Sequence, residues 1–251
     1  MSVKTVADWF SRDRRSDRTV LVDETGRSYD AHWVITTAWK AGNFLRHTGI
    51  RRGVTVGVAG RGPIPLLAFF GTTLLEGTTW FDPPRSLASN SSVRTVVASV
   101  DAIDEYDLAP GTQRVGYGGR PDDPSVHALD PGLWSENPSF PPISIDPETT
   151  VLTDGARTYD HHDVLSAARA VATKYDVDTG AQVRVRGPLS DPRTVVAGIV
   201  APLVGGGVIV LDEHASTESS AGASAEPTVI VEASGDTNEA IPVIVEEIAL
   251  E

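Results

Sequence analysis

The feature that most constrains the fold is a regular alternation between short β-branched runs and longer segments with helical periodicity. The first half predicts a strand at 19–23, a helix at 30–49, a strand at 54–60, a helix at 63–77 and the run TTWFDPP at 78–84. Asp30 suits an N-cap, Gly49 suits a helix end, and the prolines that follow Gly62 suit a helix start. Strands separated by helices at this spacing indicate βαβ units in a parallel sheet.

A second α/β unit follows with the same alternation. It predicts the strand TTVL at 149–152, then elements at 161–175 (helix), 182–187 (strand), 192–204 (helix) and 207–213 (strand). Asp191 before Pro192 is an N-cap with proline at the first helical position. Weaker strands are predicted at 95–101, 113–118, 227–233 and 241–249.

The domain prediction divides the chain at a proline-rich stretch. We expect a first α/β subdomain at 1–120, a connector at 121–144 and a second subdomain at 145–251. Small and polar residues at 214–226 lack an apolar period, so this stretch is expected to be a flexible loop.

Charge and composition exclude several functions. The net charge of −13 argues against binding to nucleic acid or to an anionic membrane. Because the chain has no cysteine, disulfides, thiolate zinc sites and cysteine nucleophiles are excluded. No apolar run is long enough to span a membrane, and we expect a cytoplasmic protein.

The basic residues are almost all arginine, and the lysines are limited to Lys4, Lys40 and Lys174. A lysine-poor, acidic surface suits a cytoplasm rich in salt, where screening weakens the repulsion between carboxylates. We therefore expect a halophilic protein, with an ordinary acidic cytosolic protein as the alternative.

Two further patterns resemble sites but favour structural roles. His161, His162 and Asp163 are adjacent residues of a predicted helix, so their side chains point about 100° apart and are poorly placed to share a metal. We interpret them as a first helical turn after the N-cap Asp160, with no metal site.

The glycine-rich stretches 57–63 and 115–121 lack dinucleotide-binding spacing and are interpreted as turns. The aromatic residues of the first two predicted helices are expected in the core: Trp33, Trp39, Phe44, Phe69 and Phe70.

Two long blocks resemble the adenylate-forming superfamily of acyl-CoA synthetases, peptide-synthetase adenylation domains and luciferases. In residues 21–84, Gly26 with Tyr29, Gly49 with Gly53, and Gly77 with Asp82-Pro83 stand at the positions of that family's opening motifs. DPETTVLTD at 146–154, and the run from Asp160 to Glu213, resemble its second block in the same order. The resemblance implies an α/β fold with two parallel-biased sheets and surrounding helices, like a cut-down N-terminal domain of acyl-CoA synthetases.

The sequence departs from the family where ATP is held. In the family, a loop reading TSGTTGxPKG lies between the strand and the helix, and its amides, hydroxyls and lysine bind the ATP phosphates. Between Leu152 and His161 this chain has no lysine and no glycine pair, and Asp154 and Asp160 place negative charge beside Arg157. The residues left to contact a phosphate are Thr153, Arg157 and Thr158. The family's adenine, magnesium and ribose motifs and its C-terminal domain are also missing from the sequence.

These observations predict a degenerate AMP-binding, acyl-CoA synthetase-like pseudoenzyme without a catalytic residue. It would serve as a binding or regulatory partner of a protein or of a small acyl or nucleotide ligand. The sequence does not identify a cofactor, and if ATP or AMP binds, we do not expect it to be turned over. The alternative is an acyl-adenylate or acyl-CoA ligase that works with a shortened phosphate loop or a partner subunit. A third hypothesis is that a crevice between the subdomains still binds an acyl group or AMP.

Overall fold

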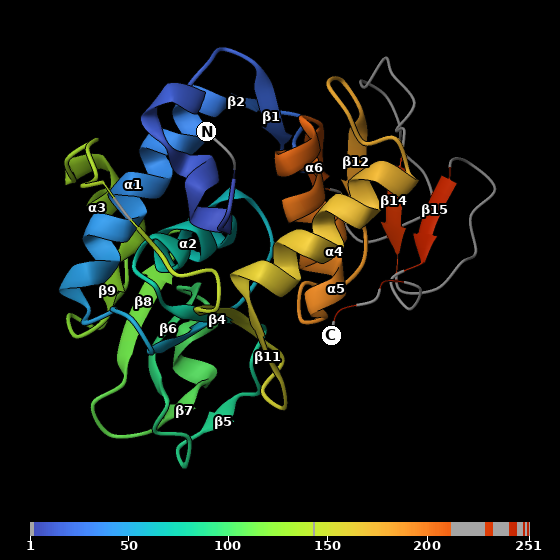
Figure 1. Cartoon of the computed structure of the whole chain (residues 1–251). Coiled ribbons are helices and arrows are strands. Elements are labelled where there is room, and N and C mark those ends of the chain that lie inside the picture. The colour runs from blue at the N-terminus through green and yellow to red at the C-terminus, as the bar shows by residue number, and fades with distance from the viewer. Residues whose placement is uncertain are drawn as a thin grey trace. The chain divides into compact units, whose positions relative to one another are not determined.

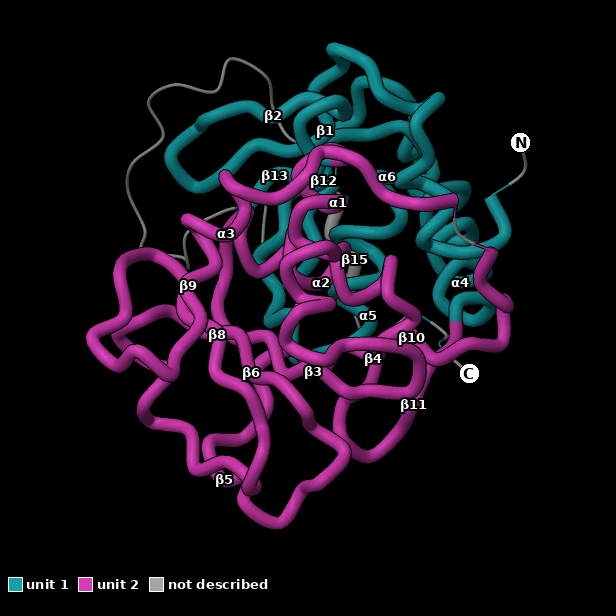
Figure 2. Tube along the Cα trace, turned by 90° about the vertical axis from the view of Figure 1, so that its left-hand side faces the viewer, with its two compact units in different colours: residues 1–34, 161–251 teal, residues 35–160 magenta. Residues whose placement is uncertain are grey.

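The computed structural model describes residues 3–142, 144–211, 229–232, 241–244, 248 and 250, with backbone only for 241–244. It has two large, mostly parallel sheets with helices, which confirms the α/β prediction (Figure 1). The chain forms two compact units, residues 1–34 with 161–251 and residues 35–160 (Figure 2). This division differs from the predicted one at 120 and 145, because the first unit is built from both ends of the chain.

Unit 2 contains a seven-stranded sheet in the order β11-β10-β4-β3-β6-β8-β9. All neighbours are parallel except the hairpin pair β10 and β11. The strands are β3 (Thr55–Val58), β4 (Thr78–Phe81), β6 (Val93–Ser99), β8 (Gln113–Tyr117), β9 (His127–Ala128), β10 (Thr150–Thr153) and β11 (Thr158–Asp160). Helix α2 (Pro63–Leu74) connects β3 to β4 as predicted, but it ends three residues earlier than the predicted Gly77.

Unit 1 contains a six-stranded sheet in the order β15-β14-β12-β13-β1-β2. Its strands are β1 (Thr19–Val22), β2 (Ser28–Asp30), β12 (Gln182–Val185), β13 (Val208–Leu211), β14 (Val229–Glu232) and β15 (Ile241–Ile244). The predicted loop at 214–226 lies outside the described residues. The helices are α4 (His161–Lys174), α5 (Pro192–Val195) and α6 (Ala201–Gly205), the last two joined by a π-helical turn at Val196–Val200. Pro202 has no N–H to donate to the Gly198 carbonyl, which interrupts the regular helical ladder there.

The two sheets share one strand order, and each receives its hairpin from the other half of the chain. If β12, β13, β14 and β15 are matched with β3, β4, β6 and β8, the hairpins β1-β2 and β10-β11 occupy the same position. The N-terminal hairpin pairs with β13, with Leu21 opposite Ile209, whereas the central hairpin pairs with β4, with Leu152 opposite Thr79. This exchange explains why unit 1 is discontinuous in sequence, since its sheet takes the hairpin β1-β2 from the N-terminal end of the chain.

Helix α1 (Ala31–His47) begins after the predicted N-cap, because Asp30 Oδ1 accepts a hydrogen bond of 2.6 Å from the Trp33 amide. Within unit 2, α1 and α2 approach closely at two glycines. A Cβ on Gly71 would lie 2.7 Å from the Gly42 nitrogen, so only glycine fits there. Of the aromatic residues predicted in the core, Trp39, Phe69 and Phe70 are buried, whereas Trp33 and Phe44 remain partly exposed.

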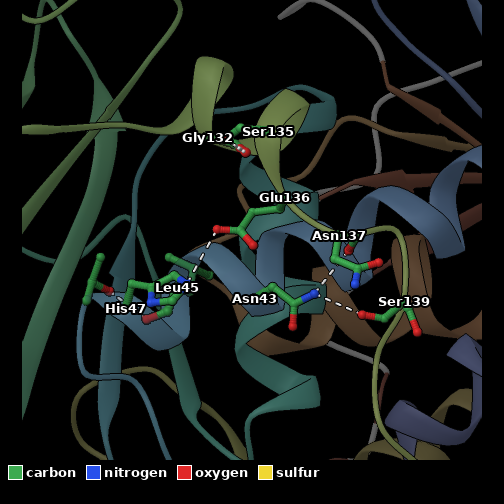
Figure 3. A network of polar contacts seen from close by, with 9 residues as sticks. Asn43, Leu45, His47, Gly132, Ser135, Glu136, Asn137 and Ser139 are labelled. Atoms are coloured by element: carbon green, nitrogen blue, oxygen red, sulfur yellow. Dashed lines mark hydrogen bonds and ion pairs between the residues drawn. The ribbon is translucent and has the colours of Figure 1, made fainter.

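The stretch predicted as a connector, 121–144, contains β9 and helix α3 (Leu129–Ser135), with Leu129 buried. Pro131 does not prevent this helix, because it lies in the first turn, where the backbone N–H has no helical partner. Asn43 of α1 donates to the carbonyls of Asn137 at 3.1 Å and Ser139 at 2.9 Å, which fastens the following chain to unit 2 (Figure 3).

Candidate functional site

The residues predicted to contact a phosphate all lie on the β10-β11 hairpin. Thr153 and Thr158 are register partners across the hairpin, and Arg157 lies in the exposed turn between them. The structure therefore brings Thr153, Arg157 and Thr158 together. Gly155, at the tip, packs against the Trp80 ring so closely that a Cβ would lie 2.3 Å from it.

Every backbone N–H of the turn at 154–157 already has a partner inside the turn. The Asp154 amide donates to the Arg157 carbonyl at 3.3 Å, and the Gly155 amide donates to Thr153 Oγ1 at 3.0 Å. The amides of Ala156 and Arg157 both donate to Asp154 Oδ1, at 2.8 and 2.6 Å. The Thr153 hydroxyl in turn donates to the Arg157 carbonyl at 2.6 Å. A phosphate at this turn would have to displace these bonds.

Asp154 is the centre of this arrangement. Its second carboxylate oxygen accepts a hydrogen bond of 3.2 Å from the hydroxyl of Tyr159, which is buried. Burial of the carboxyl raises its pKa, but the bonds from the Arg157 and Ala156 amides and from Tyr159 outweigh this, so the pKa lies below its usual value. The group is therefore charged at neutral pH and repels an anion.

The N-terminal hairpin, in unit 1, is built in the same way. Asp23 accepts from the amides of Thr25 and Arg27, both at 3.0 Å, and from the hydroxyls of Thr25 at 2.6 Å and Tyr29 at 2.7 Å. Burial of the Asp23 carboxyl raises its pKa, but these hydrogen bonds lower it by more, so the net shift is downward. Burial and the neighbouring Asp23 raise the pKa of Tyr29 to about 12.

This shared turn was not predicted, although the sequence contains a signal for it. The runs TVLVD and SYD around the first turn match TVLTD and TYD around the second. Two equal strand-turn-strand patterns in one chain predict two equal hairpins.

His161 has a structural role at the start of α4. It is 1 % exposed, and its Nδ1 accepts a hydrogen bond of 3.2 Å from the Val6 amide, which fastens the N-terminal 3₁₀ helix (Val6–Phe10) within unit 1. Among the described residues, no three His, Asp or Glu side chains gather as metal ligands would. In the same part of the chain, no helix is long and apolar enough to cross a membrane.

Comparison with solved structures identifies similar folds. The chain matches an anthranilate CoA ligase, AuaEII, solved with anthranoyl-AMP, at a TM-score of 0.71 and 14 % identity, covering 90 % of this chain and 49 % of that one. It matches a benzoate CoA ligase from Burkholderia xenovorans LB400 at a TM-score of 0.71 and 16 % identity, covering 90 % and 50 %. The N-terminal domain of FACL13 from Mycobacterium tuberculosis gives a TM-score of 0.69 and 17 % identity, covering 86 % and 58 %.

No family model matches the sequence, and no curated protein matches it. The chain spans about half the length of the solved ligases that it resembles. These matches agree with the resemblance seen in the sequence. The chain therefore has the fold of the N-terminal domain of these CoA ligases and of FACL13.

Proposed function

We propose that this protein is a non-catalytic relative of the adenylate-forming enzymes, which acts by binding a protein or a small ligand and does not activate acyl groups with ATP. The observation that supports this proposal is the turn at 154–157. A phosphate loop needs backbone N–H groups that point outward and are free for the ligand. Here the N–H groups of all four residues are used within the turn.

Electrostatics support the same proposal. A phosphate at the turn would lie beside the ionised Asp154 carboxylate, whose lowered pKa keeps it charged at neutral pH. The single cation of the turn, Arg157, is exposed, so solvent and salt screen its attraction for an anion. The remaining scaffold is intact, with buried strands and helices in both units, which suits a binding role.

The test is pyrophosphate exchange by the purified chain in molar KCl with a panel of aliphatic and aromatic carboxylic acids. A CoA ligase of the same fold serves as the positive control. We expect no acid-dependent exchange. Exchange that depends on an added acid and disappears in Arg157→Ala would overturn the proposal and support a ligase with a shortened phosphate loop.

A second measurement tests the binding role. The melting temperature is followed with ATP, AMP, CoA and fatty acids, because a ligand that binds the native state alone raises it. A shift with AMP or a fatty acid in the absence of exchange supports a small-ligand role. No shift with any of them favours a protein partner.

A further inference from the structure

Unit 2 contains a cavity of about 530 Å³, bordered by the β10-β11 hairpin. It lies along one face of the seven-stranded sheet, from the starts of β3, β4, β6 and β10 to the β10-β11 hairpin. The residues that line it are Arg52, Gly53, Thr55, Glu76, Thr78, Trp80, Asn90, Ser92, Glu148, Thr149, Thr150, Thr153, Gly155 and Thr158.

The connection between β4 and β6 contains no helix and covers little of the sheet beside the cavity. A crossover between parallel strands usually contains a helix, but residues 82–92, between β4 and β6, contain only the two-residue strand β5 (Ser86–Leu87). That strand pairs with β7 (Asp107–Leu108) and joins a small apolar cluster with Val93, Val96 and Tyr106. Trp80 packs against this cluster, and the sheet surface beyond it is left to the cavity.

The direction of the strands places Trp80 in the cavity wall. Its neighbour Phe81 contacts Phe69 of α2, with ring centroids 5.4 Å apart, on the helix-covered face. Because alternate side chains of a strand point to opposite faces, Trp80 faces away from α2. Thr153 is its register partner on β10, and Thr158 is the next across the hairpin, so one aromatic ring lies beside a row of hydroxyls.

The wall offers hydrogen-bonding groups that the chain itself does not use. The side chains of Thr55, Glu148 and Thr158 have no hydrogen-bond partner within the described residues. Thr149 is 8 % exposed, and its Oγ1 lacks a partner in the same part of the chain. The Thr149 hydroxyl is almost inaccessible, so the groups open to a ligand are the side chains of Thr55, Glu148 and Thr158, which are not buried.

The charges of the wall select against anions. Arg52 Nε lies 3.5 Å from Glu76 Oε2, so that cation is already paired, whereas Glu148 carries the remaining negative charge. A phosphate or carboxylate ligand would therefore meet net negative charge. A neutral molecule with many hydroxyls and one apolar face matches a wall of threonines with one tryptophan.

We propose that this cavity binds a neutral sugar or cyclic polyol. The C–H face of the ring lies against Trp80, and ring hydroxyls pair with Thr158 and with Glu148. The volume falls within the usual range of about 300–1,000 Å³ for small-molecule sites and accommodates a mono- or disaccharide. The proposal concerns a site within unit 2 and makes no use of ATP. A negative result in the sugar titration therefore does not affect the proposal that the protein does not activate acyl groups.

The test is titration of the whole chain in molar KCl with D-glucose, trehalose and myo-inositol, followed by ligand-observed NMR and tryptophan fluorescence. Sugars stabilise proteins without binding, so the readout is saturation of the signal and not the melting temperature. The three variants are Thr158→Val, Glu148→Gln and Trp80→Leu. Thr158 is exposed, and its replacement by valine keeps the shape of the side chain while removing the hydroxyl. The matched control is Trp134→Leu, because Trp134 is 81 % exposed and lies outside the cavity.

We expect saturable binding of at least one of the three compounds, weakened about tenfold in Thr158→Val and in Trp80→Leu and unchanged in Trp134→Leu. Glucose 6-phosphate, tested in parallel, should bind more weakly, because its phosphate meets the negative charge of Glu148. Choline is tested as a competing cationic ligand. The proposal is overturned if none of the three saturates up to about 50 mM, far above a millimolar dissociation constant. It is also overturned if choline or the phosphate ester binds best, or if Thr158→Val and Glu148→Gln bind like the original chain.

Discussion

Replacing Asp23 or Asp154 by alanine tests whether a carboxylate holds each hairpin turn. Asp23 accepts four hydrogen bonds, and one donor is the hydroxyl of Tyr29, which is 8 % exposed. A bond to a charged group contributes about 1.5–3 kcal/mol, but amides in an open turn regain bonds to water. Most of the loss therefore comes from the buried Tyr29 bond, and we expect Asp23→Ala to lower the free energy of unfolding by about 3 kcal/mol.

The Asp154→Ala variant should lose less. Asp154 accepts three hydrogen bonds, two of them from amides in an exposed turn, and the bond from Tyr159 is longer, at 3.2 Å. We expect a loss of about 1.5–2 kcal/mol. Asp122→Ala is the matched control, because Asp122 is exposed and its side chain has no hydrogen bond within the described residues. Its effect should stay within about 0.5 kcal/mol.

The measurement is urea unfolding in molar KCl followed by circular dichroism, with the free energy extrapolated to water. A double-mutant cycle with Tyr29→Phe isolates the Asp23–Tyr29 pair and should give a coupling of about 1 kcal/mol or more. The reasoning is refuted if Asp23→Ala is no more destabilising than Asp122→Ala. It is also refuted if Asp154→Ala has the larger effect of the two hairpin variants.

Three further predictions concern pH, packing and salt. The pKa values of Asp23 and Asp154 are lowered from 3.8 in the folded chain, so their stabilisation is complete above that value and is lost as the pH falls through the lowered values. Asp23→Asn removes one of these titrating carboxyl groups. Between neutral pH and about pH 2.5, the urea midpoint of this variant should therefore fall less steeply than that of the original chain. Gly71→Ala should cost about 2 kcal/mol or more in urea unfolding, because its Cβ meets the backbone of α1. Gly119→Ala should cost less, because its Cβ meets the side chain of Val100 alone within 4 Å. The melting temperature should rise with KCl, since screening reduces the repulsion of 34 acidic residues against 21 basic ones, and a flat profile would remove the halophile proposal.

The sequence contained most of the information needed for the helices and the parallel strands. Asp30 and Asp191 were predicted as N-caps, and both side chains accept a hydrogen bond from an amide in the first turn, Asp191 from Arg193 at 2.9 Å. These features are local, because a cap depends on residues within one turn. The partners of the strands are not local: β1 pairs with β13, far along the chain, and an apolar run does not specify its partner. The exchange of hairpins therefore could not be predicted from periodicity.

The candidate site was also only partly predictable from the sequence. The alignment to the family's motifs placed Thr153, Arg157 and Thr158 in a shortened phosphate loop, and the structure does bring them together. It also places them on a hairpin, which was not predicted because β11 has only three residues, too few for an alternating pattern to be recognised in the sequence. The roles of Asp154 and Tyr159 depend on that hairpin, so they were missed together with it.

A loop between a strand and a helix cannot both satisfy its own amides and hold a phosphate strongly. A phosphate cradle keeps N–H groups unpaired until the ligand arrives, which leaves the empty loop less stable. An aspartate at the first turn position has the opposite effect, because its carboxylate pairs with those N–H groups permanently. At Asp23 this is an ordinary way to close an exposed hairpin. At Asp154 an aspartate with a tyrosine partner across the hairpin closes the second turn by the same kind of bonds, at the expense of a free anion site.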